Sequence, residues 1–167
     1  HPLHRRVLAD VIARWLGATM MVFETVRALD DADAGDATAA GLERMLTPLC
    51  KAFTGKLGPA IVSECMEAIG GHAYIEESPL PRLLRDAQVL PIWEGTTNII
   101  SLDLLRVLQG GASQEAWLAR AARALDAGKG KAPATAIDAA ARAVDGARAV
   151  LAAVRTTERE AAERGAR

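Results

Sequence analysis

The sequence has few cysteines, few aromatic residues and little net charge, and each shortage excludes a class of protein. Two of the 167 residues are cysteines, Cys50 and Cys65, which is too few for a fold built on disulfides and gives no CxxC metal motif. The formal net charge of -1 provides no general attraction for nucleic acid or anionic membranes. No apolar run approaches the roughly 20 residues that span a bilayer. We therefore expect a cytoplasmic protein with reduced thiols.

The residues that are abundant favour helices. Half of the sequence is apolar while only 4% is aromatic, and alanine and straight-chain residues lose little conformational freedom in a helix. No segment shows the strict alternation of apolar and polar residues that marks a strand. These patterns predict an all-α fold, an up-down helical bundle with two appended C-terminal helices.

The first part of the chain predicts two long helices. Apolar residues recur at helical spacing over residues 3–29, and the acidic stretch 30–38 predicts a loop. A second helix is expected over residues 39–69. It should kink or break at Pro59, because proline removes a helical hydrogen bond, and it should end at the glycine pair 70–71.

The rest of the chain is less regular. Residues 72–93 hold three prolines and no sustained period, so we expect an irregular segment with one helical turn near 81–87. A third helix is predicted over residues 97–109. Ser113 is expected to cap a short fourth helix, and the segment Thr135–Asp138 to cap a final helix that reaches about residue 163.

Two short segments allow a structural or a functional interpretation. Gly70 and Gly71 either cap a helix or let a phosphate approach the backbone closely. Glu94, just before the third helix, is either part of a helix cap or a carboxylate base. Its neighbours Ile92 and Trp93 predict a poorly solvated carboxylate, which would be a stronger base near neutral pH. Taken alone, both segments favour the helix-cap interpretation.

Together these segments resemble the signature of flavin-dependent acyl-CoA dehydrogenases, with a resemblance that covers roughly residues 1–109. The corresponding positions run without a gap through Glu67, Gly70, Gly71, Ala73, Tyr74, Glu77, Pro79, Leu80, Arg82, Arg85, Asp86, Ile92, Trp93, Glu94, Gly95 and Thr96. Details in residues 64–71, 76–95 and 101–108 look like the alkylation-response branch of that family, the AidB type. Glu67 replaces the usual glutamine and Ala73 replaces a third glycine.

The resemblance implies a domain organisation and a reaction. Residues 1–110 would be the C-terminal helical domain and residues 111–167 an extension, while an N-terminal helical domain and a middle β-domain would lie elsewhere in a longer polypeptide. The reaction would be α,β-dehydrogenation of an acyl-CoA thioester, with Glu94 as the base and FAD as the hydride acceptor. The isolated fragment would be inactive.

The resemblance also implies the ligand-contacting residues and the partners. Gly95 would line the substrate pocket, and the FAD contacts would come from Glu67, Ala68, Ile69, Gly70, Gly71, Thr96, Thr97 and Asn98. In some relatives the position of His1 also contacts FAD. A homodimer or homotetramer is expected, with an electron acceptor such as electron-transfer flavoprotein. No metal is expected, since His72 has no second ligand at a suitable spacing.

Two alternatives remain open. One is an AidB-like, DNA-associated alkylation-response flavoprotein with little dehydrogenase activity, which would use a basic stripe of Arg142, Arg148, Arg155 and Arg159. Acidic residues interleave with these arginines, so a solvated helix face is favoured. The other alternative is an assembly module that keeps the motif without its chemistry.

Overall fold

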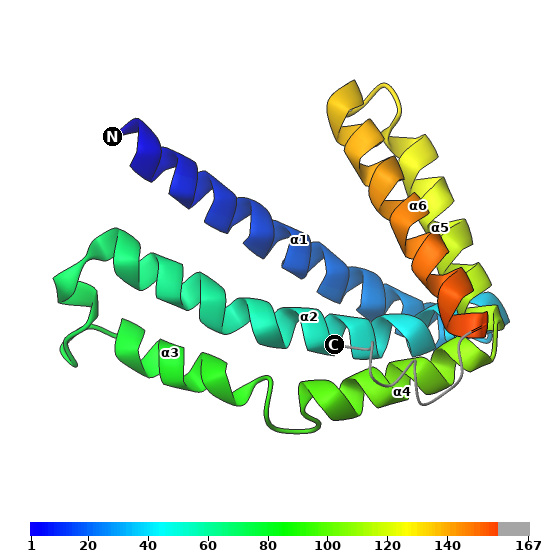
Figure 1. The fold of residues 1–167 in the computed structure, drawn as a ribbon, viewed down its shortest axis with the longest axis horizontal. Helices are drawn as coiled ribbons and strands as arrows, with labels where there is room; N and C mark the ends of the chain where they lie inside the picture. The colour runs from blue at the N-terminus through cyan, green and yellow to red at the C-terminus, as the bar shows by residue number, and fades with distance from the viewer. Residues whose placement is uncertain (157–167) are drawn as a thin grey trace.

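The computed structural model describes residues 1–156, and all of its regular elements in that range are helical (Figure 1). The predicted all-α class is therefore confirmed. One 3-10 turn, Gly71–Ala73, accompanies six α-helices: α1 Pro2–Asp33, α2 Ala37–Ile69, α3 Leu80–Val89, α4 Thr97–Gln109, α5 Ala112–Gly128 and α6 Ala134–Thr156.

The longest helix, α2, is the centre of the arrangement. It pairs antiparallel with α1, and it also contacts α3, α4 and α5. Helices α3 and α4 follow one another along α2, whereas α5 and α6 form a hairpin that projects from the end where α1 stops and α2 starts (Figure 1). Among the described residues, no helix is long and apolar enough to cross a membrane.

The turn between α1 and α2 is shorter than predicted. The expected loop over residues 30–38 shrinks to three residues, because α1 continues to Asp33. Asp31 pairs with Arg27 one helical turn earlier at 2.6 Å, which supports this last turn. Asp36 then caps α2 by accepting hydrogen bonds from the N–H groups of Thr38 at 2.8 Å and Ala39 at 3.1 Å.

Helix α2 passes through two internal prolines, Pro48 and Pro59. A kink or a break was expected at Pro59, and the break is absent, because the helix continues to Ile69. Each proline still leaves the carbonyl four residues earlier without its helical N–H partner. Cys50 and Cys65 both lie on this helix as free, half-buried thiols.

Three further expectations about the smaller helices are wrong. Helix α3 has ten residues rather than one turn, because Pro81 lies in its first turn, where a proline is tolerated. Gly111, with φ of 78°, rather than Ser113, precedes α5. Helix α6 begins at Ala134, ahead of the predicted Thr135 cap, and the Pro133 carbonyl accepts its first bonds. The predicted end of this helix, near residue 163, lies outside the described residues.

The buried core lies at one end of the molecule. Its two clusters draw on the end of α1, the first half of α2, the end of α4, and parts of α5 and α6. One cluster is Ala28, Leu42, Leu46 and Ala116, and the other is Met45, Val107, Leu108 and Leu151. The half-buried Trp117 contacts both clusters and links them. This is where the burial of apolar surface stabilises the chain most.

The opposite end is open. Helix α1 exposes large apolar side chains along its length, among them Trp15 at 55%, Met20 at 69% and Phe23 at 68% exposure. Monomeric soluble proteins seldom expose so much contiguous apolar surface. Helix α1 therefore packs against α2, but many of its apolar side chains remain exposed in the described part of the chain.

An ion cluster joins the α5–α6 hairpin to α1. The half-buried Glu24 accepts hydrogen bonds from Arg27 at 2.8 Å and from Nη2 of Arg120 on α5 at 3.0 Å. The bonds from Arg27, and then those from Arg120, lower the pKa of Glu24 from its ordinary 4.5 to about 2, against the opposing effect of partial burial. Charged Glu24 therefore ties two segments that are far apart in the sequence.

We expect this cluster to make stability fall in acid. Because the folded-state pKa of Glu24 is depressed, its contribution is complete above pH 4.5 and is lost as the pH falls towards 2. Glu24→Gln should lower the free energy of unfolding by about 1–2 kcal/mol at pH 7, and the difference from wild type should disappear near pH 2. Urea titrations across this pH range measure it.

The control for this prediction is Asp10→Asn. Asp10 pairs only within α1, with Arg14 at 2.8 Å, and both side chains are 59% exposed, so its loss should cost less than about 0.5 kcal/mol. An E24Q chain whose stability matched wild type at every pH would contradict the assigned role of Glu24.

Candidate functional site

The segment that joins α3 to α4 carries the candidate base. After α3 ends at Val89, the chain makes one more turn, in which the N–H groups of Ile92 and Trp93 both donate to the Val89 carbonyl, at 2.9 and 3.0 Å. Glu94 and Gly95 then take positive φ angles of 55° and 114°. The two consecutive left-handed residues reverse the chain into the start of α4.

Glu94 has the only positive φ of any non-glycine residue in the described part of the chain. Such a conformation costs free energy for a residue with a Cβ, and it persists only where the surroundings impose it. At Gly95, an added Cβ would lie 3.0 Å from Cδ1 of Ile100, so a side chain there is opposed by φ and would also require Ile100 to shift. The reversal therefore requires glycine at position 95 and tolerates strain at position 94.

The inner side of this segment rests on α2. Nζ of Lys51 donates to the carbonyls of Leu90 at 2.7 Å and Trp93 at 3.0 Å. One turn further along α2 the buried Gly55 lets the segment approach closely, since an added Cβ would be 3.4 Å from Cα of Pro91. The segment is thus held at its carbonyl groups and by backbone packing.

The start of α4 is fixed and accessible. Thr96 occupies the N-cap position without a side-chain cap, and Thr97 and Asn98 form the first turn. Free N–H groups at a helix start attract anionic groups. Arg44 of α2 forms a two-point ion pair with Asp103, at 2.9 and 2.8 Å, which holds α4 against α2.

The expected dry surroundings of Glu94 are not present in this chain. The Glu94 side chain is exposed, and its apolar neighbours Ile92 and Trp93 are 62% and 53% exposed. The reason is that only the inner side of the segment packs on α2. Any desolvation of this carboxylate has to come from outside the described residues.

The glycine pair caps α2, as its structural interpretation predicted. Gly70 has φ of 85°, and its N–H donates to the Met66 carbonyl at 2.9 Å. Nothing lies within 4 Å of a Cβ added at Gly70 or Gly71, so the backbone there is open to a ligand as well. Glu67 and Ile69 are exposed, while Ala68 is half-buried.

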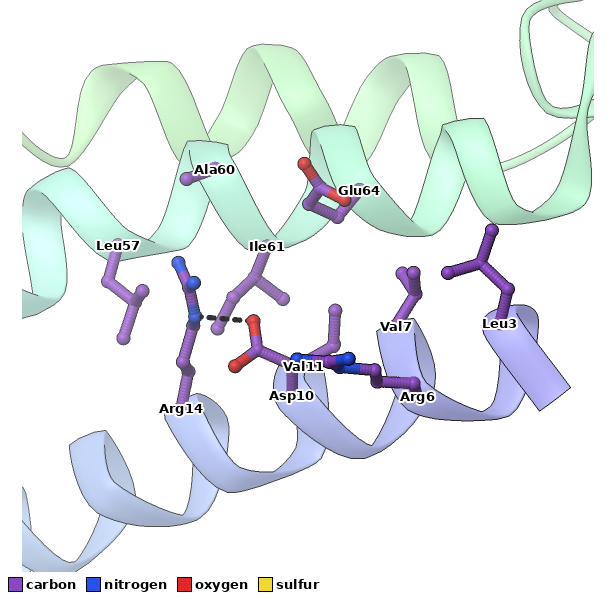
Figure 2. A pocket seen from close by; sticks show the side chains of 10 residues that line it. All are labelled: Leu3, Arg6, Val7, Asp10, Val11, Arg14, Leu57, Ala60, Ile61 and Glu64. Atoms are coloured by element: carbon purple, nitrogen blue, oxygen red, sulfur yellow. Dashed lines mark ion pairs between the residues drawn. The ribbon is translucent and has the colours of Figure 1, made fainter.

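Several surface clefts lie beside this end of α2 in the described structure, and two of them are formed together with the start of α1. One, of about 310 Å³, places Glu67 and Ala68 with His1 and His4. The larger one, of about 470 Å³, runs between α1 and α2 and is lined by Leu3, Arg6, Val7, Asp10, Val11, Arg14, Leu57, Ala60, Ile61 and Glu64 (Figure 2). In Figure 2 the apolar side chains of the two helices face each other, with the Arg14–Asp10 pair and Glu64 among them.

The structure does not unite the predicted site residues in one place. Residues 67–71 precede α3, whereas residues 94–98 follow it. With ten residues in α3 and a rise of about 1.5 Å per residue, the helix alone is about 15 Å long. The chain therefore presents the predicted site residues as two separate segments, 67–71 and 94–98.

The remaining predicted charges form ordinary ion pairs. Arg82 lies 3.7 Å from Asp86, and Arg85 pairs with Glu76 at 3.0 Å, all of them exposed. On α6, Arg142 and Arg148 alternate with Asp138 and Asp145. The described side chains of α6 therefore carry no excess of positive charge for DNA, while the side chains of residues 155 and 159 lie outside the described part.

The chain belongs to the acyl-CoA dehydrogenase family. The family model described as "Acyl-CoA dehydrogenase, C-terminal domain" matches residues 1–109, which contain both segments 67–71 and 94–98. The predicted resemblance is thus confirmed.

Two curated relatives are equally similar to the chain. It is 46% identical over 111 residues to acyl-CoA dehydrogenase family member 11 of Caenorhabditis elegans, and 46% identical over 108 residues to the putative acyl-CoA dehydrogenase AidB of Escherichia coli. These matches cover 65% and 64% of this chain, but 18% and 19% of the relatives. The chain therefore spans about a fifth of their length, and its resemblance to AidB is no greater than to the nematode protein.

Solved structures agree with the fold. The apo form of Bd2924 superposes with a TM-score of 0.76 at 34% identity. The match covers 100% of this chain and 30% of the Bd2924 chain. The C. elegans ACDH-11 structure, a complex with C11-CoA, superposes with a TM-score of 0.68 at 42% identity. This match covers 75% of this chain and 22% of the ACDH-11 chain. The Bd2924 match includes the α5–α6 hairpin.

Sequence reasoning missed the residues that hold the α3–α4 segment. These residues contact segments that are tens of positions away in the sequence, and no local motif marks them. They are Lys51, Gly55 and the Arg44–Asp103 pair. The only signal in the sequence was the i,i+4 spacing that places Lys51 and Gly55 on one face of α2, and this spacing has many other meanings.

Gly95→Ala should destabilise the chain more than Gly35→Ala. Both glycines have large positive φ angles, 114° and 98°, but only Gly95 would also bring its new Cβ to 3.0 Å from a neighbouring side chain. We expect about 1 kcal/mol for Gly35→Ala and about 2–3 kcal/mol for Gly95→Ala. Denaturant unfolding of both variants measures the difference, and equal losses would contradict the tight contact with Ile100.

Proposed function

We propose that this chain is the C-terminal domain of an FAD-dependent acyl-CoA dehydrogenase that removes two hydrogens from adjacent carbons of an acyl thioester. The observation that carries the proposal is the strained reversal at Glu94 and Gly95, directly before α4, inside the region that matches the family. Glu94 is proposed to remove the α-proton, and Gly95 to line the substrate pocket. By itself this chain is expected to be inactive.

The local backbone supports this role of Glu94. Its side chain is exposed, so a substrate can reach it. Among residues 1–156 no acceptor takes the Glu94 backbone N–H, which leaves that group available to polarise a thioester carbonyl as negative charge develops. Exclusion of water from the carboxylate would come from parts of the complete protein outside the described residues.

The two segments, 67–71 and 94–98, fit an anionic, extended cofactor such as FAD. The uncapped start of α4 offers N–H groups at Thr97 and Asn98 next to the exposed Thr96, and Gly70 and Gly71 offer open backbone. The Glu67 carboxylate has to face away from any phosphate at Ala68, Ile69 or the glycine pair. FAD, when bound, supplies the hydride acceptor.

An acyl-CoA substrate follows from the family. The related C. elegans structure is a complex with C11-CoA, and we propose a CoA thioester for the complete form of this protein. Electron-transfer flavoprotein is the proposed class of electron acceptor. The cytoplasmic location remains a prediction.

We also propose self-association as a homodimer or homotetramer. The support is the open apolar surface of α1, including Met20 and Phe23, which no described residue covers. The mass of the complete protein in solution, from light scattering, tests this proposal, and a monomeric mass would contradict it.

Glu94→Gln in the complete enzyme should reduce turnover by about 10²–10⁴-fold, because the amide cannot accept the α-proton. The measurement is flavin reduction by saturated acyl-CoA under anaerobic conditions, with flavin content checked beforehand. Glu115→Gln on the exposed first turn of α5 is the matched control and should retain full turnover. Unchanged flavin reduction in E94Q would refute the assignment of the base.

A further inference from the structure

We propose that Lys51 is a positioning residue for Glu94, and that it sets the orientation of the peptide group between Trp93 and Glu94. The inference rests on the proposed function, because it assigns a catalytic consequence to a contact made by a residue on α2. Lys51 itself touches neither substrate nor the reacting atoms.

The Lys51 ammonium group links the two ends of the turn that precedes Glu94. Nζ lies 2.7 Å from the Leu90 carbonyl oxygen and 3.0 Å from that of Trp93, and 5.8 Å from the centroid of the Trp93 ring. These carbonyls lie at or just beyond the C-terminal end of α3, where the partial charge of a helix is negative and a cation is favourable. The position therefore suits a lysine.

The contact with Trp93 controls the direction of a neighbouring group. The Trp93 carbonyl and the Glu94 N–H belong to one peptide unit, and a planar trans peptide holds these two groups pointing in opposite directions. The chain has no cis peptide in its described part. Because Lys51 draws the carbonyl towards α2, the Glu94 N–H is directed away from α2, to the side open to a ligand.

The same contact supports the strained residue. Glu94 has φ of 55°, and a rotation of the preceding peptide group would let it relax towards an unstrained conformation. The bond from Lys51 to the Trp93 carbonyl opposes this rotation. Lys51 thus holds in place both the backbone of the candidate base and the N–H group proposed to polarise the thioester.

The variant that tests the proposal is Lys51→Met in the complete, flavin-loaded enzyme. Methionine keeps most of the apolar stem but cannot donate to either carbonyl. We expect kcat to fall by about 10- to 100-fold with KM changed less than about threefold, since a small misplacement of reacting groups has effects of this size. Lys51→Arg, which can donate to both carbonyls, should restore most of the loss.

A second readout follows the backbone rather than activity. Hydrogen exchange of the peptide covering residues 88–96 should be faster in K51M than in wild type and should return towards wild type in K51R. Lys56→Met is the matched control, since Lys56 is an exposed lysine on the same helix, and it should change neither kcat nor the exchange of this peptide. Flavin content and melting temperature show that each variant is folded.

The outcomes separate this inference from the function on which it rests. If E94Q loses turnover while K51M stays within about twofold of wild type, the role of Lys51 is overturned and the function stands. If E94Q keeps its turnover, the proposed function fails, whatever exchange shows in K51M. A K51M enzyme that loses turnover with unchanged exchange in residues 88–96, and is not rescued by K51R, also overturns the positioning role.

Discussion

The packing of the first half of α2 is the constraint on which the rest of the structure depends. Leu42, Met45 and Leu46 are nearly inaccessible, and the end of α1, the end of α4, and α5 and α6 are all assembled around them. Both segments that carry predicted site residues are positioned by their attachment to this helix. The α3–α4 reversal rests on α2 through Lys51 and Gly55, and the 67–71 turn is the end of α2 itself.

Burial is uneven along the chain. One end has a compact core, while the other exposes the apolar side of α1 and an open groove in which Trp15 and Leu83 face α2 residues such as Ile61. A domain that functions alone would have to cover this surface with its own residues. The chain spans about a fifth of the length of its curated relatives.

The sequence predicted the long-range pattern of the fold better than its junctions. Apolar periodicity indicated α1, α2 and α4, because a helix that packs against a neighbour needs apolar residues at helical spacing on one face. The junctions depend on single contacts, such as the Arg27–Asp31 pair that extends α1 and the left-handed Gly111 that displaces the expected Ser113 cap. Local spacing does not report which of several plausible caps forms.

The site shows the same division. The motif placed Glu94 and Gly95 directly before a helix, and α4 begins there, but the reversal with positive φ at both residues was not predicted. The expected dryness around Glu94 is absent, since Ile92 and Trp93 are adjacent to it in sequence but are themselves largely exposed. The contribution of Lys51 was invisible because it comes from a residue about forty positions earlier, placed only by the docking of α3 on α2.

The internal Pro59 removes one bond from the hydrogen-bond ladder of the continuous helix α2. Without the N–H of residue 59, the hydrogen-bond ladder is interrupted between the buried first half and the final turns, which are mostly exposed or half-buried. The last turns have fewer buried contacts than the first half, and low burial is the condition under which local opening costs least. The glycine turn at the end of α2 lies beyond this interruption, in the less buried part of the helix.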